Sequence, residues 1–268
     1  MTAWWWPQTM LAAVLVVSYA HGGLAQTAVV AEYEVRYGPL TVLTLRATSE
    51  LGSGRYRSTS EMRTVGMVGY LFPWHSSATS EGRYDETGPR PSSYRSQGEY
   101  RGQRRMVALD YSEGGTVVTV AEPPADSDFR DAVPSELQQQ TVDPLSATLS
   151  LAATPCHGTQ HVFDGRRRYD VQLTDLGDAT VPAAGQQLYR GRARRCRGEI
   201  RVLAGFWRVE SHHDERPSRI DFWVAAPRPD LPLVPVYVEL SSPLGTLSIP
   251  LAAIRPASEP VPDAEGHR

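Results

Sequence analysis

The sequence predicts a mainly β protein, built as a single strongly curved antiparallel sheet (half-barrel or barrel-like) with one covering helix. Hydrophobic residues make up 41% of its 268 residues, which is enough to form a core. The 21 prolines and 22 glycines are spread along the chain, a distribution typical of short strands joined by turns. Between them, apolar and polar side chains alternate in most segments, which is the period of a strand with one solvated face.

Residues 1–25 have the features of a cleavable signal peptide. They contain no charged side chain, and an apolar run from Met10 to Ala20 precedes a small-residue exit at 23–25. That run is shorter than the roughly 20 residues that a membrane-spanning helix needs. A retained anchor is the alternative, because tryptophan occupies positions 4–6, where lysine or arginine is usual. We therefore expect an exported protein, peripheral to a membrane rather than spanning it.

Alternation predicts the first group of strands, and glycine-rich turns separate them. The strands expected here are 31–37, 40–47, 56–65, 92–99, 101–110 and 116–121. Gly66–His75 is apolar without clear alternation. Because Pro73 stops a helix, we predict a short helical or looped flap at this position.

One segment predicts a helix. Asp143 can act as its N-cap, Pro144 occupies the first helical position, and Pro155 ends it. The helix is expected at 144–152, and strands resume at 160–176, 186–197, 200–212, 218–226, 234–240 and 244–251. We expect residues 26–254 to form one β-rich domain and residues 255–268, which have almost no apolar content, to be a disordered tail.

Cys156 and Cys196 are the two cysteines of the chain. An even pair in an exported protein predicts a disulfide, which stabilises a fold mainly by restricting the unfolded chain. A reduced buried pair and a metal site are the alternatives, and the lack of a CxxC spacing argues against zinc.

The composition and the missing motifs exclude several classes of enzyme. All 27 basic residues are arginine, so lysine-dependent chemistry such as Schiff-base formation is excluded. A net charge of −3 gives no basic excess for nucleic acid. No GxSxG, HExxH or GxGxxG motif occurs. We therefore predict no catalytic residue, no cofactor and no enzymatic activity.

Two histidine-containing segments are candidate metal ligands. His157 and His161 are four residues apart, but Gly158 and Pro155 disfavour the helix that would place both on one face. His212–Glu215 offers four ligands in a row, but adjacent strand residues point to opposite faces, and a solvated hairpin tip explains the segment better. We predict no metal site.

Arginines are concentrated between positions 166 and 201. This segment contains nine arginines and only four acidic residues. If 189–197 is a strand, Arg190, Arg192 and Arg194 share one face with Cys196. Guanidinium groups suit phosphates and carboxylates, so this run is a candidate site for lipid headgroups, lipopolysaccharide or an acidic polymer. The candidate anion-binding residues are Arg166, Arg167, Arg168, Arg190, Arg192 and Arg194. The alternative is a solvated strand face paired with nearby acids.

Aromatic residues are a second candidate feature. They are Tyr70, Phe72, Trp74, Phe206, Trp207, Phe222 and Trp223. Core packing is one explanation. If the sheet is curved but open, some of these residues would instead line a concave apolar groove suited to an acyl chain.

Several short signatures together resemble the domain-of-unknown-function 3108 family. They are TVDPLSA at 141–147, Cys156, VFDGRRRYD at 162–170, GRA at 191–193 followed by Cys196, and AGF at 204–206. The resemblance covers residues 33–251 and implies an exported, periplasmic protein of Gram-negative bacteria without established catalytic residues. A distant likeness, of architecture only, is to the lipoprotein-carrier half-barrels, which hold acyl chains against a helix-covered concave sheet; fold likeness does not transfer function.

Three hypotheses follow. The first is a non-enzymatic periplasmic protein that binds an amphipathic or anionic envelope molecule, such as a lipid, in its curved sheet. The second is a structural or interaction protein of the envelope that docks through the arginine-rich strand. The third is a hydrolase of envelope polymers, with Asp164, His161 or Asp214 as candidate groups. The oligomeric state is left open.

Overall fold

The computed structural model describes residues 27–100, 102–128, 130–153, 156–208, 218–242 and 245–257. The strands are β1 (Thr27–Tyr37), β2 (Leu40–Gly52), β3 (Arg55–Thr64), β4 (His75–Asp85), β5 (Gly88–Tyr100), β6 (Gln103–Tyr111), β7 (Val117–Glu122), β8 (Thr159–Phe163), β9 (Arg168–Thr180), β10 (Arg192–Ala204), β11 (Arg219–Ala225), β12 (Val234–Ser242) and β13 (Gly245–Pro256). The helices are α1 (Gly66–Leu71), α2 (Ser135–Gln138), α3 (Pro144–Ala153) and the 3-10 helix η1 (Ala125–Asp128).

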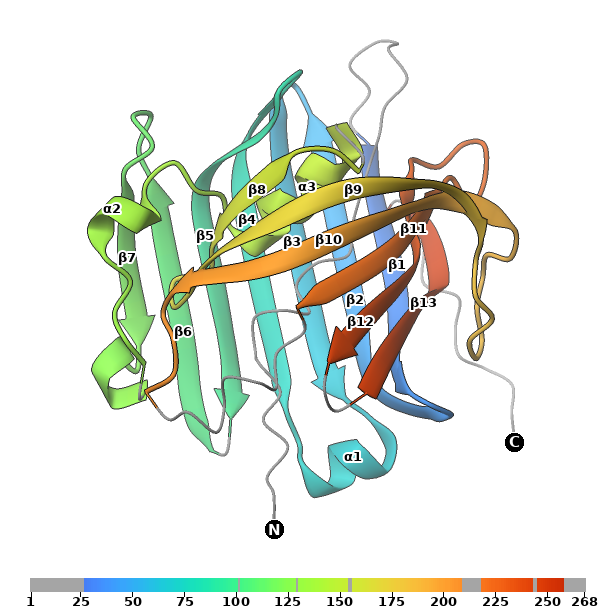
Figure 1. Cartoon of the computed structure of the whole chain (residues 1–268), viewed down its shortest axis with the longest axis horizontal. Helices are drawn as coiled ribbons and strands as arrows, with labels where there is room; N and C mark the ends of the chain where they lie inside the picture. The colour runs from blue at the N-terminus through green and yellow to red at the C-terminus, as the bar shows by residue number, and fades with distance from the viewer. Residues whose placement is uncertain are drawn as a thin grey trace.

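All described strands belong to one antiparallel sheet in the order β7-β6-β5-β4-β3-β2-β1-β13-β12-β11-β10-β9-β8. It consists of two runs of consecutive strands that meet where β1 pairs with β13. The sheet is strongly curved, and β8 and β9 cross in front of β3–β5 with α3 between them (Figure 1). Within the described residues, its two ends do not pair with each other as a ladder. The predicted fold class is therefore confirmed as a curved, unclosed sheet with a covering helix.

The strands of the first run follow the alternation in the sequence. In β2, Leu43, Leu45 and Ala47 are buried, while the residues between them are partly exposed. The largest core cluster combines residues of β1 and β2 with residues of β10–β13. The inner face of the sheet is thus apolar where the two runs meet.

Three strand predictions are wrong in detail. β4 was not expected, because its inward positions are small residues such as Ala78 and Ser80, so the apolar alternation is weak. The segment 160–176 forms β8 and β9 rather than one strand, since the chain turns at Gly165, where φ is +85°. The strands expected at 186–197 and 200–212 are replaced by β10, which begins at Arg192 and continues without a break to Ala204.

The predicted flap and the predicted covering helix are both present, as α1 and α3. Asp143 is the N-cap of α3, because its Oδ1 accepts the N–H groups of Leu145 (2.9 Å) and Ser146 (3.0 Å). Its Oδ2 accepts the hydroxyls of Ser80 on β4 (2.8 Å) and Ser146 (2.5 Å), and the Tyr56 hydroxyl lies 2.7 Å from Ser146 Oγ. Burial raises the pKa of Asp143. This buried polar network fixes the helix against β3 and β4.

Cys156 and Cys196 form the predicted disulfide, with a Cα–Cα distance of 5.1 Å. It joins the segment after α3 to β10, and both residues are fully buried. At the other end of the chain β13 continues to Pro256, two residues past the predicted end of the domain. The predicted signal peptide lies outside the described residues, and so does the predicted tail from residue 258 onward.

Candidate functional site

Arg166, Arg167 and Arg168 are not surface residues, with relative exposures of 9%, 1% and 7%. The Arg166 guanidinium donates to the carbonyls of Glu122 (2.8 Å) and Pro123 (2.9 Å), at the end of β7. These contacts hold the β8–β9 turn against the opposite end of the sheet. The prediction that this triplet presents an anion-binding surface is therefore wrong for these three residues.

Asp164 organises the same turn. Its Oδ1 accepts the backbone N–H groups of Arg166 (2.8 Å) and Arg167 (2.7 Å), and its Oδ2 accepts from Arg167 Nε at 3.1 Å. Two glycines allow the close packing: a Cβ on Gly165 would lie 2.2 Å from a side-chain atom of β6, and one on Gly205 would lie 2.1 Å from the Arg166 carbonyl oxygen. These hydrogen bonds and the two glycines account for the shape of this turn.

The remaining candidate arginines are exposed. Arg190 precedes β10 in an irregular segment. Arg192 donates to the carbonyl of Asp178 (3.1 Å), and Arg194 forms an ion pair with Asp175. The hydrogen bond from Arg194 lowers the pKa of Asp175. Arg192 and Arg194 thus have partners on the neighbouring strand β9, as the solvated-face alternative requires.

The predicted shared face of Arg194 and Cys196 is not seen in their exposure. The Arg194 side chain is 49% exposed, whereas Cys196 is fully buried. The register with β9 shifts between these two residues, and the extra residue of this irregularity lies on β9.

The seven candidate groove residues are not brought together. Phe222 and Trp223 belong to the main core cluster. Trp74, in the segment between α1 and β4, packs against that cluster. Tyr70 and Phe72 are instead 87% and 68% exposed. Phe206 and Trp207 are half-buried beyond β10, and Trp207 stacks under the Arg130 guanidinium. A single aromatic-lined groove is therefore not formed by this set.

The histidine segments give no metal centre in the part of the chain that the structure describes. His161 is half-exposed, and its Nδ1 lies 2.7 Å from Asp170 Oδ1. Burial would raise the pKa of Asp170, but hydrogen bonds from His161 and Arg168 outweigh this effect and lower it. His212–Glu215, including the hydrolase candidate Asp214, lies outside the described residues.

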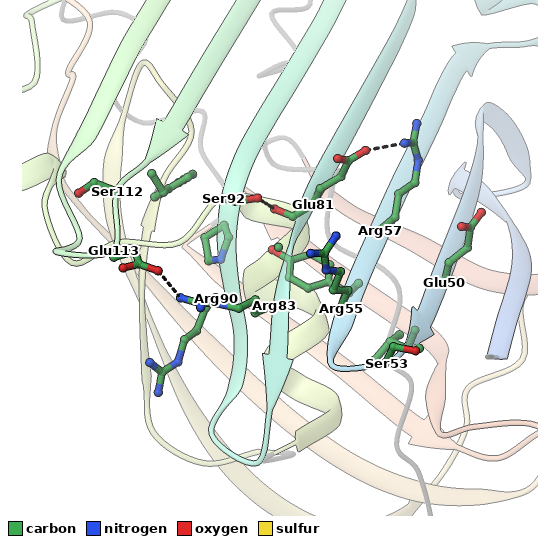
Figure 2. Close-up of a pocket in the computed structure, with 16 residues that line it drawn as sticks. Glu50, Ser53, Arg55, Arg57, Glu81, Arg83, Arg90, Ser92, Ser112 and Glu113 are labelled. Carbon is green, nitrogen blue, oxygen red and sulfur yellow. Dashed lines mark hydrogen bonds and ion pairs between the residues drawn. The ribbon is translucent and has the colours of Figure 1, made fainter. Parts of the chain in front are cut away.

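A site that the sequence did not reveal lies at the turn end of β2–β6. Arg55 on β3 is directly opposite Arg83 on β4, and Arg83 is directly opposite Arg90 on β5. Residues paired in this way point to the same face of a sheet. We call these three residues the arginine row; Figure 2 shows them in the hollow that they line.

The hollow has a volume of about 690 Å³ and is open to solvent. Its lining residues are Glu50, Leu51, Gly52, Ser53, Arg55, Tyr56, Arg57, Glu81, Gly82, Arg83, Arg90, Pro91, Ser92, Tyr111, Ser112 and Glu113. Arg57 is paired with Glu81 at 2.5 Å, next to the arginine row. The hydroxyls of Ser53, Ser92 and Ser112 add hydrogen-bonding groups around the rim.

The arginine row is only partly neutralised. Arg83 contacts Glu113 at 3.3 Å, but both side chains are more than half exposed, so this pair is weak. Arg90 contacts Asp85 at 3.0 Å. Arg55 has no carboxylate partner among the described residues. Like charges directly opposite each other on neighbouring strands destabilise a sheet. The lining of the hollow combines four arginines with three glutamates, so the arginines exceed the acidic groups by one.

The sequence signal for this site is the position of its three arginines near the turns that join neighbouring strands. Arg55 follows the turn at 53–54, and Arg83 and Arg90 flank the turn between β4 and β5. Since β4 was not predicted, the register that aligns the three arginines could not be derived.

Comparison with known proteins agrees with the resemblance. The family described as "Protein of unknown function (DUF3108)" matches residues 32–252. No curated protein matches the sequence. Among solved structures, a β-barrel-like protein of domain of unknown function DUF1849 from Brucella abortus is similar, with a TM-score of 0.49 and 11% identity over 87% of this chain and 99% of that chain. The family match spans most of the chain, and the protein therefore belongs to the DUF3108 family of proteins of unknown function.

Proposed function

We propose that this chain is a non-enzymatic, exported envelope protein that binds an anionic, phosphate-bearing envelope molecule on its curved sheet. The observation that carries the proposal is the arginine row, with Arg55, Arg83 and Arg90 directly opposite one another on adjacent strands. The site differs from the arginine run expected from the sequence, but the ligand chemistry is the same.

The number and position of the arginines favour phosphate over a single carboxylate. Guanidinium groups donate paired N–H groups that fit phosphate oxygens. Three side chains on adjacent strands supply more donors than one carboxylate accepts, whereas a phosphate monoester or a diphosphate has enough oxygens for all three. The volume of about 690 Å³ lies within the range of small-ligand sites.

The alternative of docking through Arg190, Arg192 and Arg194 is less well supported. Arg192 and Arg194 already have partners on β9. Surface pairs of this kind are ordinarily solvation features. Arg83 and Arg90 also have carboxylate partners, but Arg83 is in addition opposite an arginine on each side, and Arg55 has no carboxylate partner among the described residues.

The test is calorimetric titration of the full chain with inorganic pyrophosphate at low salt. We expect the double variant Arg55→Ser/Arg83→Ser to bind at least about tenfold more weakly, because each hydrogen bond to a charged group contributes roughly 1.5–3 kcal/mol. Its melting temperature should not fall, since the substitutions remove like-charge repulsion. Vesicles containing phosphatidylglycerol are titrated in parallel with the wild type and the double variant. A lipid headgroup at the arginine row is indicated only if the double variant also binds the vesicles more weakly.

The matched control is Arg228→Ser, which removes an exposed arginine paired with Asp230 away from the hollow. It should bind pyrophosphate as the wild type does. Equal affinities for the wild type and the double variant, or an equal loss in the control, would show that the arginine row is not the site.

A further inference from the structure

The end of the sheet opposite the arginine row carries an unusual concentration of exposed apolar side chains. On α1 and the residue after it, Met67, Tyr70, Leu71 and Phe72 have relative exposures of 78%, 87%, 58% and 68%. None of the residues of α1 is buried. Scattered exposed apolar residues are normal, but a contiguous group marks an interaction surface.

A neighbouring hairpin extends this group. Tyr37 and Leu40, which flank the turn between β1 and β2, are 37% and 61% exposed. The backbone N–H of Val65, just before α1, donates to the carbonyl of Val42 on β2 at 3.1 Å, which places the two segments next to each other. We call Tyr37, Leu40, Met67, Tyr70, Leu71 and Phe72 the apolar end.

The apolar end is held in place rather than loosely attached. The Thr64 hydroxyl donates to the Phe72 carbonyl (3.0 Å) and accepts from the Trp74 N–H (2.9 Å), which ties together the two ends of the α1 segment. Val68 and Trp74 pack against the main core cluster. The outward side chains are therefore presented by a fixed support.

The α1 segment itself carries no acidic side chain. Residues 62–80 contain no aspartate or glutamate, and they include Arg63. Arg63 is the cross-strand partner of His75 at the base of α1, and His75 is in turn opposite Glu99 on β5. A segment with apolar side chains at its tip and a cation at its base is complementary to a bilayer with anionic headgroups.

From these contacts we infer that the apolar end inserts into the interfacial region of an anionic lipid bilayer. Its shape fits this partner, because α1 projects beyond the ends of the strands (Figure 1) and a bilayer receives a projecting group without a matching cavity. Tyrosine and tryptophan are enriched at this depth of a membrane. No helix in the described part of the chain is long and apolar enough to span a bilayer.

This orientation bears on the arginine row. α1 follows the last residue of β3, and Arg55 is the first residue of that ten-residue strand. At roughly 3.3 Å per residue, the arginine row lies about 30 Å from the membrane-facing end. A ligand of the arginine row would therefore be presented away from the bilayer that α1 contacts.

The test is co-sedimentation of the full chain with vesicles of phosphatidylethanolamine and phosphatidylglycerol (3:1). The variant Tyr70→Ser/Phe72→Ser should partition at least about tenfold less than the wild type, with an unchanged melting temperature because both side chains are exposed. Vesicles of phosphatidylcholine alone should bind the wild type less, since they lack the anionic headgroup. Residues 1–25 are present in every protein compared, so they do not contribute to the difference.

The matched control is Leu176→Ser/Leu188→Ser, which removes two apolar side chains that are 41% and 50% exposed elsewhere on the surface. It should sediment like the wild type. Equal partitioning of the α1 variant and the wild type would overturn the inference. So would a concentration-dependent dimer that only the α1 variant loses, because the occupant would then be a second copy of the chain. Pyrophosphate binding is measured without vesicles, so the two proposals can fail separately.

Discussion

Gly205 illustrates how a single residue permits close packing at one end of this sheet. Its φ is +81°, and a Cβ there would lie 2.1 Å from the carbonyl oxygen of Arg166. Backbone from the segment after β10 thus packs directly on the β8–β9 turn. The approaching group, the Arg166 carbonyl, lies far away in the sequence, so only the structure identifies it.

Gly205→Ala should lower the free energy of unfolding by more than about 2 kcal/mol, because the substitution combines an unfavourable φ with a backbone clash. Urea denaturation measures this value. Gly177→Ala is the matched control: φ is +76° at Gly177 and nothing lies within 4 Å of a Cβ, so we expect a loss of only about 1 kcal/mol. If both variants lose the same free energy of unfolding, the close approach of the Arg166 carbonyl to Gly205 does not contribute to stability.

At the scale of elements, β10 shows why side-chain faces were predicted incorrectly. Alternation assigns Arg194 and Cys196 to one face, but Arg194 is exposed and Cys196 is buried where the register with β9 shifts. Such a shift depends on the pairing with β9, which local sequence does not reveal. The helix α3 was predictable because its signals, the Asp143 cap and Pro144, are local.

The pairing of β10 with β11 gives a pH-dependent contribution to stability. Asp221 on β11 accepts hydrogen bonds from Arg195 (2.5 Å) and from Arg197 (2.8 and 2.9 Å), and its side chain is only 5% exposed. Burial would raise the pKa of Asp221, but the hydrogen bonds from Arg197 and Arg195 outweigh it and lower the pKa. The stabilisation is therefore complete above the ordinary aspartate pKa of about 4 and is lost as the pH falls through the lower folded-state value.

Asp221→Asn should lower the free energy of unfolding by about 2 kcal/mol at pH 7, because two arginines lose a charged partner. The difference from the wild type should shrink as the pH is lowered from 5 to 2, which urea denaturation across that range would reveal. Asp230→Asn, at a carboxylate that is 62% exposed, should have almost no effect. A constant difference between wild type and Asp221→Asn at every pH would contradict the assignment.

At the scale of the whole molecule, the sequence was sufficient for the fold class, the covering helix and the disulfide. Each of these depends on composition, on local alternation or on the count of cysteines. The candidate site was not predictable, because the arginine row needs the register of three strands, one of which has too few apolar residues to be recognised. The burial of the triplet at 166–168 escapes sequence reasoning for a related reason: the partners of Arg166 lie on β6 and at the end of β7, far away in the sequence, although Arg167 and Arg168 pair locally with Asp164 and Asp170.

The most direct measurement of the proposed function is native mass spectrometry of the protein purified, without detergent, from the envelope of the cell that produces it. Wild type and Arg228→Ser should carry a phosphate-bearing ligand that is retained in the intact protein, and Arg55→Ser/Arg83→Ser purified in parallel should not. Equal occupancy in all three proteins, or a wild type that is repeatedly recovered without any ligand, would contradict the role of the arginine row.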